Sequence, residues 1–236
     1  MIIITVPAYN ESKNLKKCVE SLLHASLALN EAFYVVIAED GSTDGTAAVA
    51  ARLEKMYQNV IHFHSAQKLG RGLALKNAWN KLDGDIYVFV DCDLATDMKY
   101  FPQLINTIRE GNDLATGSRY ITGAKVNRPF LRAFTSRIYN KLIRMIYKDK
   151  IFDHQIGFKA FSRRLIQDEL NKCKSDDWFW DTEIIIRSIH DNYKCVEFPV
   201  EWEEKKGKRT PLKRLLSDIM IHGLGIIRLK ETLYEK

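Results

Sequence analysis

Residues 86–93 read Ile86-Tyr-Val-Phe-Val-Asp-Cys-Asp93, the clearest strand pattern in the chain. Its five consecutive apolar residues predict a strand that is buried on both faces, as the strands of a parallel sheet are. Two carboxylates, Asp91 and Asp93, follow at the point where the strand ends. Ligands of open parallel sheets collect beyond the carboxyl ends of the strands. The stretch therefore predicts an α/β sheet with a polar site at one edge.

The segments on either side of this strand alternate in the same way. Further strands are expected over residues 2–6, 33–38, 60–63 and 114–116. Helices are expected from Ser12 onward, over residues 46–56 and 101–108, and through Ala74, Ala78 and Trp79 after Gly70-Arg-Gly72. A β-α-β-α order predicts a mostly parallel central sheet with helices on both faces.

The alternation stops at about Arg119. The second half is expected to hold, in order, a basic helix over residues 129–147, an irregular stretch over 152–161, helices near 163–171 and 181–190, a strand over 193–199 and an amphipathic helix from 211. No internal repeat and no linker rich in proline, glycine or serine separates the halves. We therefore expect one domain over residues 1–236 whose two halves have different tasks.

The composition is that of a folded globular protein, because 46% of the 236 residues are hydrophobic and 28% are charged. No apolar run approaches the roughly 20 residues of a membrane-spanning helix. The N-terminal stretch has no basic region before its apolar residues, so it reads as a first strand rather than a signal peptide. The four cysteines form no CxxC pair, which argues against a cysteine zinc site or a disulfide framework and favours a cytoplasmic location.

Charge is distributed unevenly along the chain. Residues 1–118 hold 11 basic and 14 acidic residues, whereas residues 119–236 hold 25 basic and 16 acidic residues. The segment 119–150 alone contains nine basic residues and one acid, Asp149. A basic half of this kind favours an anionic partner, namely nucleic acid, a phosphorylated substrate or an acidic membrane surface, and a merely solvated basic face is the alternative.

Acidic side chains follow three of the expected strands, in Pro7-Ala-Tyr-Asn-Glu11, Glu39-Asp-Gly-Ser-Thr-Asp44 and Asp91-Cys-Asp-Leu94. Carboxylates gathered at one rim repel one another unless a cation or a hydrogen-bonding ligand lies between them. Asp91 and Asp93 can both reach one hard cation through oxygen. Mg²⁺ or Mn²⁺, which keep bound waters and bridge substrate phosphates, fit this ligand set.

Two common nucleotide-binding motifs are missing from the sequence. Gly70-Arg-Gly72 does not extend to GxGxxG, since Leu75 stands at the position of the third glycine, and no GxxxxGK[ST] occurs. A basic nucleic-acid-binding protein is a further alternative. The acidic rim and the absence of an RNP-like or helix-based DNA-binding motif argue against it, so no nucleic acid partner is expected.

Six stretches follow one another in the order of a known family: Val6-Pro-Ala-Tyr-Asn-Glu11, Glu39-Asp-Gly-Ser-Thr-Asp-Gly-Thr46, Leu69-Gly-Arg-Gly-Leu-Ala74, Asp91-Cys-Asp-Leu94, Gly117-Ser-Arg-Tyr120 and Asp153 through Phe161. Together they resemble the inverting glycosyltransferases of family 2, and more narrowly the dolichyl-phosphate mannose and glucose synthases. The resemblance implies the GT-A fold and transfer of a sugar from a GDP- or UDP-linked donor to a polyprenyl phosphate. It also implies a peripheral position at the cytoplasmic membrane face.

The same resemblance assigns tasks to segments. Residues 1–118 would bind the nucleotide sugar, residues 119–210 would bind the acceptor, and residues 211–236 would form an amphipathic C-terminal segment. A transferase that acts on a hydroxyl of a glycan or another acceptor is the alternative within the family.

Particular residues also receive roles from the resemblance. The nucleotide sugar would be bound by Pro7, Tyr9, Glu11, Asp40, Lys68, Asp91 and Asp93. Asp93, together with Asp91, would hold Mg²⁺ or Mn²⁺ on the diphosphate. The acceptor phosphate would be bound by Arg119, Arg132, Ser136 and Lys159, and the catalytic set would be Asp91, Asp93 and Arg119. One departure is Ala95, which stands where the synthases often have a glutamine that contacts the metal. It leaves the metal geometry and the sugar open.

The chemistry of the acceptor decides whether a base is needed. A phosphate oxygen is already anionic near neutral pH, so a basic segment that holds it close to the donor is enough. A hydroxyl acceptor would instead need a carboxylate base. Asp181 and Glu183 are the candidates for that base, and acids favoured by the dipole at a helix N-terminus are the alternative interpretation.

Five other residues are singled out and given structural roles. His62 and His64 alternate on an expected strand; they could pair as ligands, but they are interpreted as an ordinary strand edge. Trp178 and Trp180 are expected in the core rather than stacked on a sugar. His154 receives no catalytic role.

The C-terminal segment combines a basic cluster with an apolar stripe. The cluster comprises Lys205, Lys206, Lys208, Arg209, Lys213 and Arg214, and the stripe comprises Leu212, Leu215, Leu216, Ile219 and Met220. This pattern predicts a helix that lies on a membrane surface without spanning it, with packing of the stripe on its own domain as the alternative.

Overall fold

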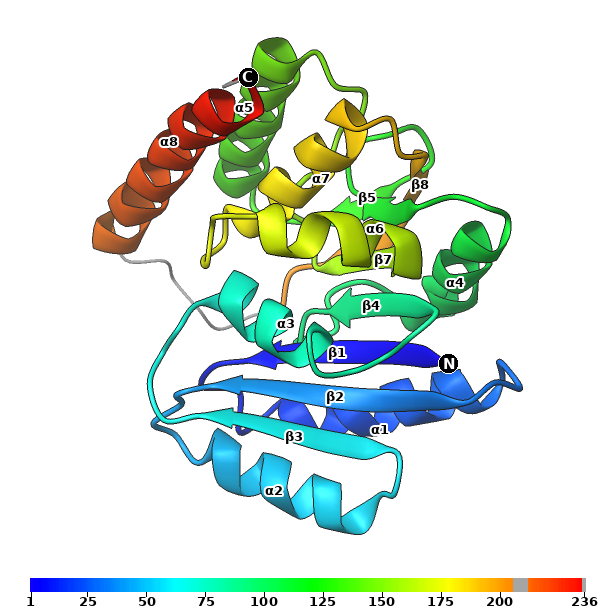
Figure 1. Ribbon diagram of the computed structural model, residues 1–236. Helices are drawn as coiled ribbons and strands as arrows, with labels where there is room; N and C mark the ends of the chain where they lie inside the picture. Colours follow the sequence, from blue (N-terminus) through cyan, green and yellow to red (C-terminus); the bar gives the residue numbers. More distant parts are fainter. Residues whose placement is uncertain (206–211, 235–236) are drawn as a thin grey trace.

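The structure, a computed structural model, describes the backbone of residues 1–205 and 212–234 and the side chains of residues 1–205 and 222–233. Its centre is a seven-stranded sheet (Figure 1) with the order β3-β2-β1-β4-β7-β5-β8. The strands are β1 (Ile2–Ala8), β2 (Phe33–Asp40), β3 (Val60–Ser65), β4 (Ile86–Val90), β5 (Leu114–Ser118), β7 (Phe158–Ser162) and β8 (Cys195–Pro199). All neighbouring pairs are parallel except the two that involve β7. The mostly parallel sheet expected from the sequence is confirmed.

Helices cover both faces of this sheet. They are α1 (Leu15–Leu27), α2 (Thr46–Met56), α3 (Arg71–Trp79), α4 (Phe101–Arg109), α5 (Phe130–Tyr147), α6 (Arg163–Glu169), α7 (Trp180–His190) and α8 (Leu212–Tyr234), with short 3₁₀ turns at Met98–Tyr100 and Leu170–Lys172. Helices α1, α2 and α4 pack on one face, and α3, α6 and α7 pack on the other (Figure 1).

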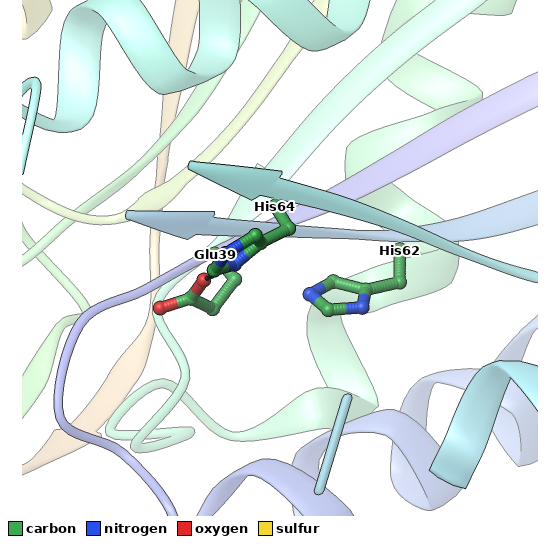
Figure 2. A group of neighbouring side chains, drawn as sticks. All are labelled: Glu39, His62 and His64. Atoms are coloured by element: carbon green, nitrogen blue, oxygen red, sulfur yellow. Dashed lines mark hydrogen bonds and ion pairs between the residues drawn. The ribbon is translucent and has the colours of Figure 1, made fainter. Parts of the chain in front are cut away.

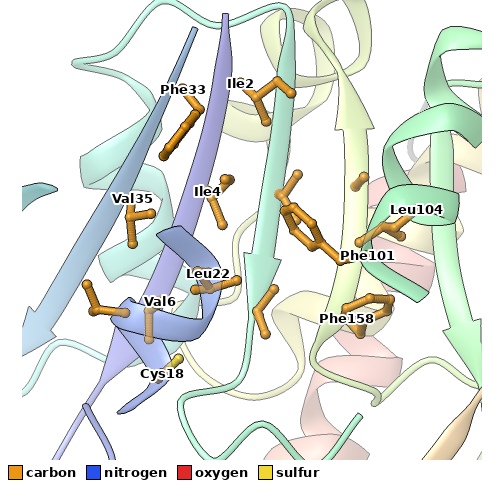
Figure 3. Close-up of a cluster of buried hydrophobic side chains, with 14 of the residues drawn as sticks. Ile2, Ile4, Val6, Cys18, Leu22, Phe33, Val35, Phe101, Leu104 and Phe158 are labelled. Atoms are coloured by element: carbon orange, nitrogen blue, oxygen red, sulfur yellow. The ribbon is translucent and has the colours of Figure 1, made fainter. Parts of the chain in front are cut away.

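The alternation of side chains along each strand creates two cores. Ile2, Ile4 and Val6 of β1 point to the face covered by α1, where they meet Leu22 (Figure 3). Ile3, between them, belongs to the core on the other face. Because strand side chains alternate and both faces are covered, the interior strands are mostly apolar. The acidic residues Glu11, Asp91 and Asp93 follow the ends of β1 and β4.

The expectation that residues 152–161 are irregular is wrong for the second half of this stretch. Phe158–Ser162 forms β7, which runs antiparallel between β4 and β5. Lys159 interrupts the apolar run of this strand and hides the pattern, yet its side chain is fully buried. A short parallel pair, β6 (Lys125–Asn127) and β9 (Glu201–Glu203), is likewise absent from the sequence-based expectation.

Helix α8 confirms the expected helical C-terminal segment and packs beside α5 (Figure 1). Leu229 is buried against Ile143 of α5 and Ile186 of α7, and the Tyr147 hydroxyl donates to the Ile226 carbonyl at 2.6 Å. Lys206, Lys208 and Arg209 lie outside the described residues, as do the side chains of Lys213, Arg214 and the apolar stripe 212–220. Among those described, no helix is long and apolar enough to span a membrane.

Candidate active site

The loops after β1 and β2 are joined by hydrogen bonds. The Asn10 amide donates to Ser42 Oγ at 3.0 Å, the Thr43 amide donates to Asn10 Oδ1 at 2.8 Å, and the Glu11 amide donates to Thr46 Oγ1 at 2.8 Å. Asn10 has a φ of 56°, a left-handed conformation that asparagine tolerates better than most residues. The first two acidic strand ends are therefore one structural unit.

Asp40 organises the loop that leads into α3. Its two carboxylate oxygens accept the amides of Leu69 at 2.6 Å and Gly70 at 3.0 Å. Close to this loop, the Lys68 ammonium lies 4.0 Å from the centre of the Tyr9 ring. Tyr9 and Lys68, two of the residues expected to bind the nucleotide sugar, thus form one cationic and aromatic wall.

Pro7 lies at the carboxyl end of β1, in register with Ala38 of β2. Glu11 follows on the joined loops, and its carboxylate accepts the Asn14 side-chain amide at 2.7 Å. Both residues lie on the rim where the sequence places them. Their contact with a nucleotide stays a prediction.

The turn after β4 presents two carboxylates. Asp93 Oδ1 accepts the Ala95 amide at 3.1 Å, and Leu94, the residue immediately after Asp93, has a φ of 49°. A bulky residue in the left-handed region is strained, and strain of this kind concentrates at functional sites. Desolvation, followed by repulsion from Asp91, raises the pKa of Asp93 to about 6. A divalent cation would offset this repulsion, and the all-oxygen donors suit Mg²⁺ or Mn²⁺.

Asp91 is fixed by its surroundings. Its backbone amide donates to the Gly157 carbonyl at 2.9 Å. A Cβ atom on residue 157 would lie 1.9 Å from Asp91 Cγ, so only glycine leaves room for this carboxylate. Arg71 Nη1 donates to Asp91 Oδ1 at 3.1 Å.

Arg71 connects the β4 turn to a buried network. Its guanidinium bonds the Asp181 carboxylate and lies 4.0 Å from the centre of the Trp178 ring. The Lys159 ammonium lies 3.9 Å from the other Asp181 oxygen and donates to the Ile156 carbonyl. Burial lowers the pKa of Lys159 and raises that of Asp181. Lys159 thus lies beneath the site, and its predicted contact with the acceptor phosphate remains untested.

Arg71 has no predicted role, although it lies in Leu69-Gly-Arg-Gly-Leu-Ala74, one of the six stretches that resemble the family. The signal for such a role is the arginine itself, in a chain with several acidic loops. A guanidinium beside several carboxylates commonly bonds more than one of them.

Arg119 follows β5 and forms a buried ion pair with Asp153. Its Nε and Nη2 atoms donate to the two Asp153 oxygens at 2.7 and 2.8 Å, and its backbone amide donates to the same carboxylate at 3.0 Å. The guanidinium carbon lies 5.2 Å from the centre of the Trp202 ring. Although burial opposes charge, Arg119 lowers the pKa of Asp153. The pair is neutral as a whole and fixes the position of the Arg119 guanidinium, whose contact with phosphate stays a prediction.

Arg132 and Ser136 lie one turn apart on α5. The Arg132 guanidinium pairs with Glu204, and Ser136 Oγ donates to Gln155 Oε1 at 3.1 Å. The structure places both residues on one helix, as the sequence predicts, and ties them to the loops that follow β9 and Asp153.

A cleft of about 730 Å³ opens beside Asp93. Its lining includes Leu94, Ala95 and Thr96 from the β4 turn, together with Trp202. Ala95 is buried, and its carbonyl accepts the Glu203 amide at 2.8 Å. The small side chain therefore closes the turn against β9 and supplies no ligand atom.

Three of the residues considered from sequence are structural here. Glu183 accepts the amides of Lys174 and Ser175 at 2.9 and 2.8 Å and is buried. His154 is fully buried against Asn140, and Trp180 is fully buried in the core, as expected. The expectation that Trp178 lies in the core is wrong, because its ring is exposed and lies over the Arg71 guanidinium.

Residues 3–170 match the model of glycosyl transferase family 2, and the chain belongs to this family. The fold is GT-A-like.

Particular relatives make the comparison more specific. The chain is 39% identical over 228 residues to glycosyltransferase AglD of Haloferax volcanii, a match that covers 95% of this chain and 36% of AglD. It is 28% identical over 210 residues to polyprenol monophosphomannose synthase of Mycolicibacterium smegmatis, covering 86% of this chain and 78% of that enzyme.

One solved structure with the same fold is glucosyl-3-phosphoglycerate synthase from Mycobacterium tuberculosis in complex with Mn²⁺, UDP and phosphoglyceric acid. The TM-score is 0.68 at 17% sequence identity, and the match covers 99% of this chain and 78% of that one.

Proposed function

We propose that this glycosyltransferase transfers a sugar, mannose or glucose, from a GDP- or UDP-linked donor to a polyprenyl phosphate, with inversion at the anomeric carbon. The observation that carries the proposal is an apolar stripe on α5, defined as Phe130, Leu131, Phe134, Ile138, Leu142 and Met145. These side chains are between 47% and 83% exposed. Large exposed apolar patches on a protein surface mark partner or membrane contacts.

Charge on the same helix favours a lipid as that partner. Arg132, Arg137, Lys141 and Arg144 alternate with the apolar stripe along α5. A helix with an apolar stripe and basic neighbours binds the interface of an anionic bilayer. The hydrocarbon chain of the acceptor lies in the membrane, and its phosphate therefore lies at the membrane surface that the helix would contact. Arg132 and Ser136 would then meet that phosphate from the helix that contacts the lipid.

The state of the buried carboxylates also favours a phosphate acceptor. A hydroxyl acceptor needs an accessible carboxylate base. Asp181 is fully buried against Arg71, and Glu183 is buried on the amides of residues 174 and 175. Neither is available to a substrate hydroxyl in this conformation. A phosphate oxygen requires no such base.

In the proposed reaction, an anionic oxygen of the acceptor phosphate attacks the anomeric carbon of the donor. The bond from that carbon to the nucleoside diphosphate breaks, and the diphosphate leaves with the bond's electron pair. Asp91 and Asp93 would hold the Mg²⁺ or Mn²⁺, which supplies positive charge to the leaving diphosphate. Arg71 holds the Asp91 carboxylate in place, and the Arg119 and Arg132 guanidiniums would orient the acceptor phosphate.

The relatives support the same substrate classes. One of them is a polyprenol monophosphomannose synthase, and the structural neighbour binds UDP and Mn²⁺. The lipid acceptor further implies a peripheral position at the membrane surface.

A donor screen tests the proposal. The protein is incubated with dolichyl phosphate, Mg²⁺ or Mn²⁺ and radiolabelled GDP-mannose, UDP-glucose or related donors, and the lipid products are separated by thin-layer chromatography. We expect one donor to label a lipid product. Turnover only with hydroxyl acceptors would support the alternative transferase and contradict the lipid phosphate.

A further inference from the structure

Glu39, His62 and His64 meet at the edge of the sheet (Figure 2). His62 and His64 point to the same side of the edge strand β3, and Glu39 on β2 lies in register with His64. One ligand atom from each of the three residues lies within 4.8 Å of the other two. Residues far apart in sequence are thus gathered with their nitrogen and oxygen atoms facing one another.

The three side chains differ in burial and in hydrogen bonding. Glu39 is 2% exposed, and its Oε1 accepts the Ser42 amide at 2.6 Å, which fixes the carboxylate. Glu39 Oε2 lies 2.5 Å from His64 Nδ1. The Nε2 atom of His62 is buried and has no hydrogen-bond partner among the described residues. His64, whose side chain is 54% exposed, leaves the group open to solvent.

We propose that Glu39, His62 and His64 bind a transition-metal dication of the Zn²⁺ class. Two imidazoles and one carboxylate form the three-ligand set of a tetrahedral zinc site with one open position for water. Ligand atoms that share a zinc ion lie about 2.0–2.2 Å from it and therefore roughly 3.4 Å from one another. On binding, the three ligand atoms would move to this spacing, and the metal would replace the Glu39–His64 hydrogen bond.

This site differs in chemistry and place from the aspartates after β4. Imidazole nitrogens favour Zn²⁺, Ni²⁺ or Cu²⁺ over Mg²⁺, whereas Asp91 and Asp93 offer only oxygen. Glu39 immediately precedes Asp40 and is bonded to Ser42, so a bound metal would tie the end of β3 to the loop that follows β2. The second ion would stabilise this loop independently of the reaction.

Calorimetric titration with ZnCl₂ in millimolar Mg²⁺ tests the site, since Mg²⁺ occupies oxygen ligands and leaves the histidines free. We expect one Zn²⁺ per chain with micromolar or tighter affinity and a rise in melting temperature on binding. His62→Gln and His64→Gln should each weaken binding at least about tenfold, because each removes a direct ligand. His24→Gln, an exposed histidine on α1, is the matched control and should bind like the wild type.

Two results would overturn the proposal. One is the absence of a one-to-one Zn²⁺ complex in the wild-type protein at micromolar concentrations. The other is equal affinity in the wild type and in the His62→Gln and His64→Gln variants, which would assign the ion to cysteines or carboxylates elsewhere.

Discussion

Two carboxylates of the β4 turn, Asp91 and Asp93, differ in their surroundings although they are two residues apart. Asp91 is held by Arg71 and by the space that Gly157 leaves. Asp93 faces the cleft with a pKa raised to about 6. In this site Asp91 is held by an arginine, whereas the negative charge of Asp93 is poorly stabilised. Such a site is suited to a cation that arrives with the substrate diphosphate.

The expected effect of Asp93→Asn follows from this difference. The variant keeps the shape of the side chain and removes the charge, so turnover should fall at least about 100-fold with little change in melting temperature. EDTA should stop the wild-type enzyme, and Mg²⁺ or Mn²⁺ should restore it. Asp83→Asn, at the opposite end of β4, is the control and should retain activity. Full turnover in excess EDTA would contradict the metal role.

Arg132 and Ser136 give a second prediction at the residue scale. Arg132→Ala and Ser136→Ala should raise the acceptor KM about tenfold or more, because a charge-assisted bond to phosphate is lost, while the donor KM stays near the wild-type value. Glu204→Gln is the control, since it breaks the ion pair of Arg132 but keeps the cation. An equal rise in both KM values would show that the residues do not bind the acceptor.

Glu197 predicts a pH dependence of stability. Burial raises the pKa of its carboxyl from 4.5 to about 7. Between these values the folded state holds a proton that the unfolded state releases, so this group's contribution to the free energy of unfolding falls as the pH rises from about 4.5 to 7. Urea unfolding of the wild type and Glu197→Gln across this range should show a steeper loss of stability in the wild type, since the variant lacks this group's contribution. Parallel pH profiles would contradict the assignment.

At the scale of elements, the sequence predicts most strands and helices because their apolar patterns are continuous. Strand β7 is missed because Lys159 lies in its middle, and the reason for a buried lysine is visible only once Asp181 is placed beside it. The Asp91–Asp93 pair could be predicted from its position after β4. Its connection through Arg71 to α7 could not, because residues 71 and 181 are brought together only by tertiary packing.

Helix α5 shows the same limit in another form. Its basic character is plain in the sequence, but the exposure of its apolar stripe depends on which face the rest of the chain covers. Leu229 of α8 packs against Ile143 of α5, and the apolar stripe lies outside that contact.

The stripe predicts membrane binding through α5. The protein should co-sediment with anionic vesicles at low salt, and Phe130→Ser with Phe134→Ser should reduce this binding, because two aromatic side chains leave the interface. Turnover of a short, water-soluble prenyl phosphate should persist. Leu27→Ser with Met56→Ser removes two exposed apolar side chains on α1 and α2 and serves as the control. If the wild type fails to bind, or the α5 variant binds equally well, the stripe does not contact lipid.

At the scale of the whole molecule, the two halves of the chain differ in charge. Residues 1–118 contribute the acidic rim, and residues 119–236 carry the excess of basic residues, including those of α5. We propose that the first half binds the nucleotide sugar and its cation, while the second half brings the anionic acceptor from the membrane. With the two substrates bound in this way, the reaction would need no carboxylate base between them.

The acceptor atom is the central claim, and ³¹P NMR of the purified product tests it most directly. The enzyme is supplied with its donor and either polyprenyl phosphate or unphosphorylated polyprenol of the same length. We predict that only the phosphate is used and that its phosphomonoester resonance is replaced by that of a phosphodiester joined to the sugar. Sugar transfer to polyprenol, or a glycosylated product that keeps the phosphomonoester resonance, would contradict the claim.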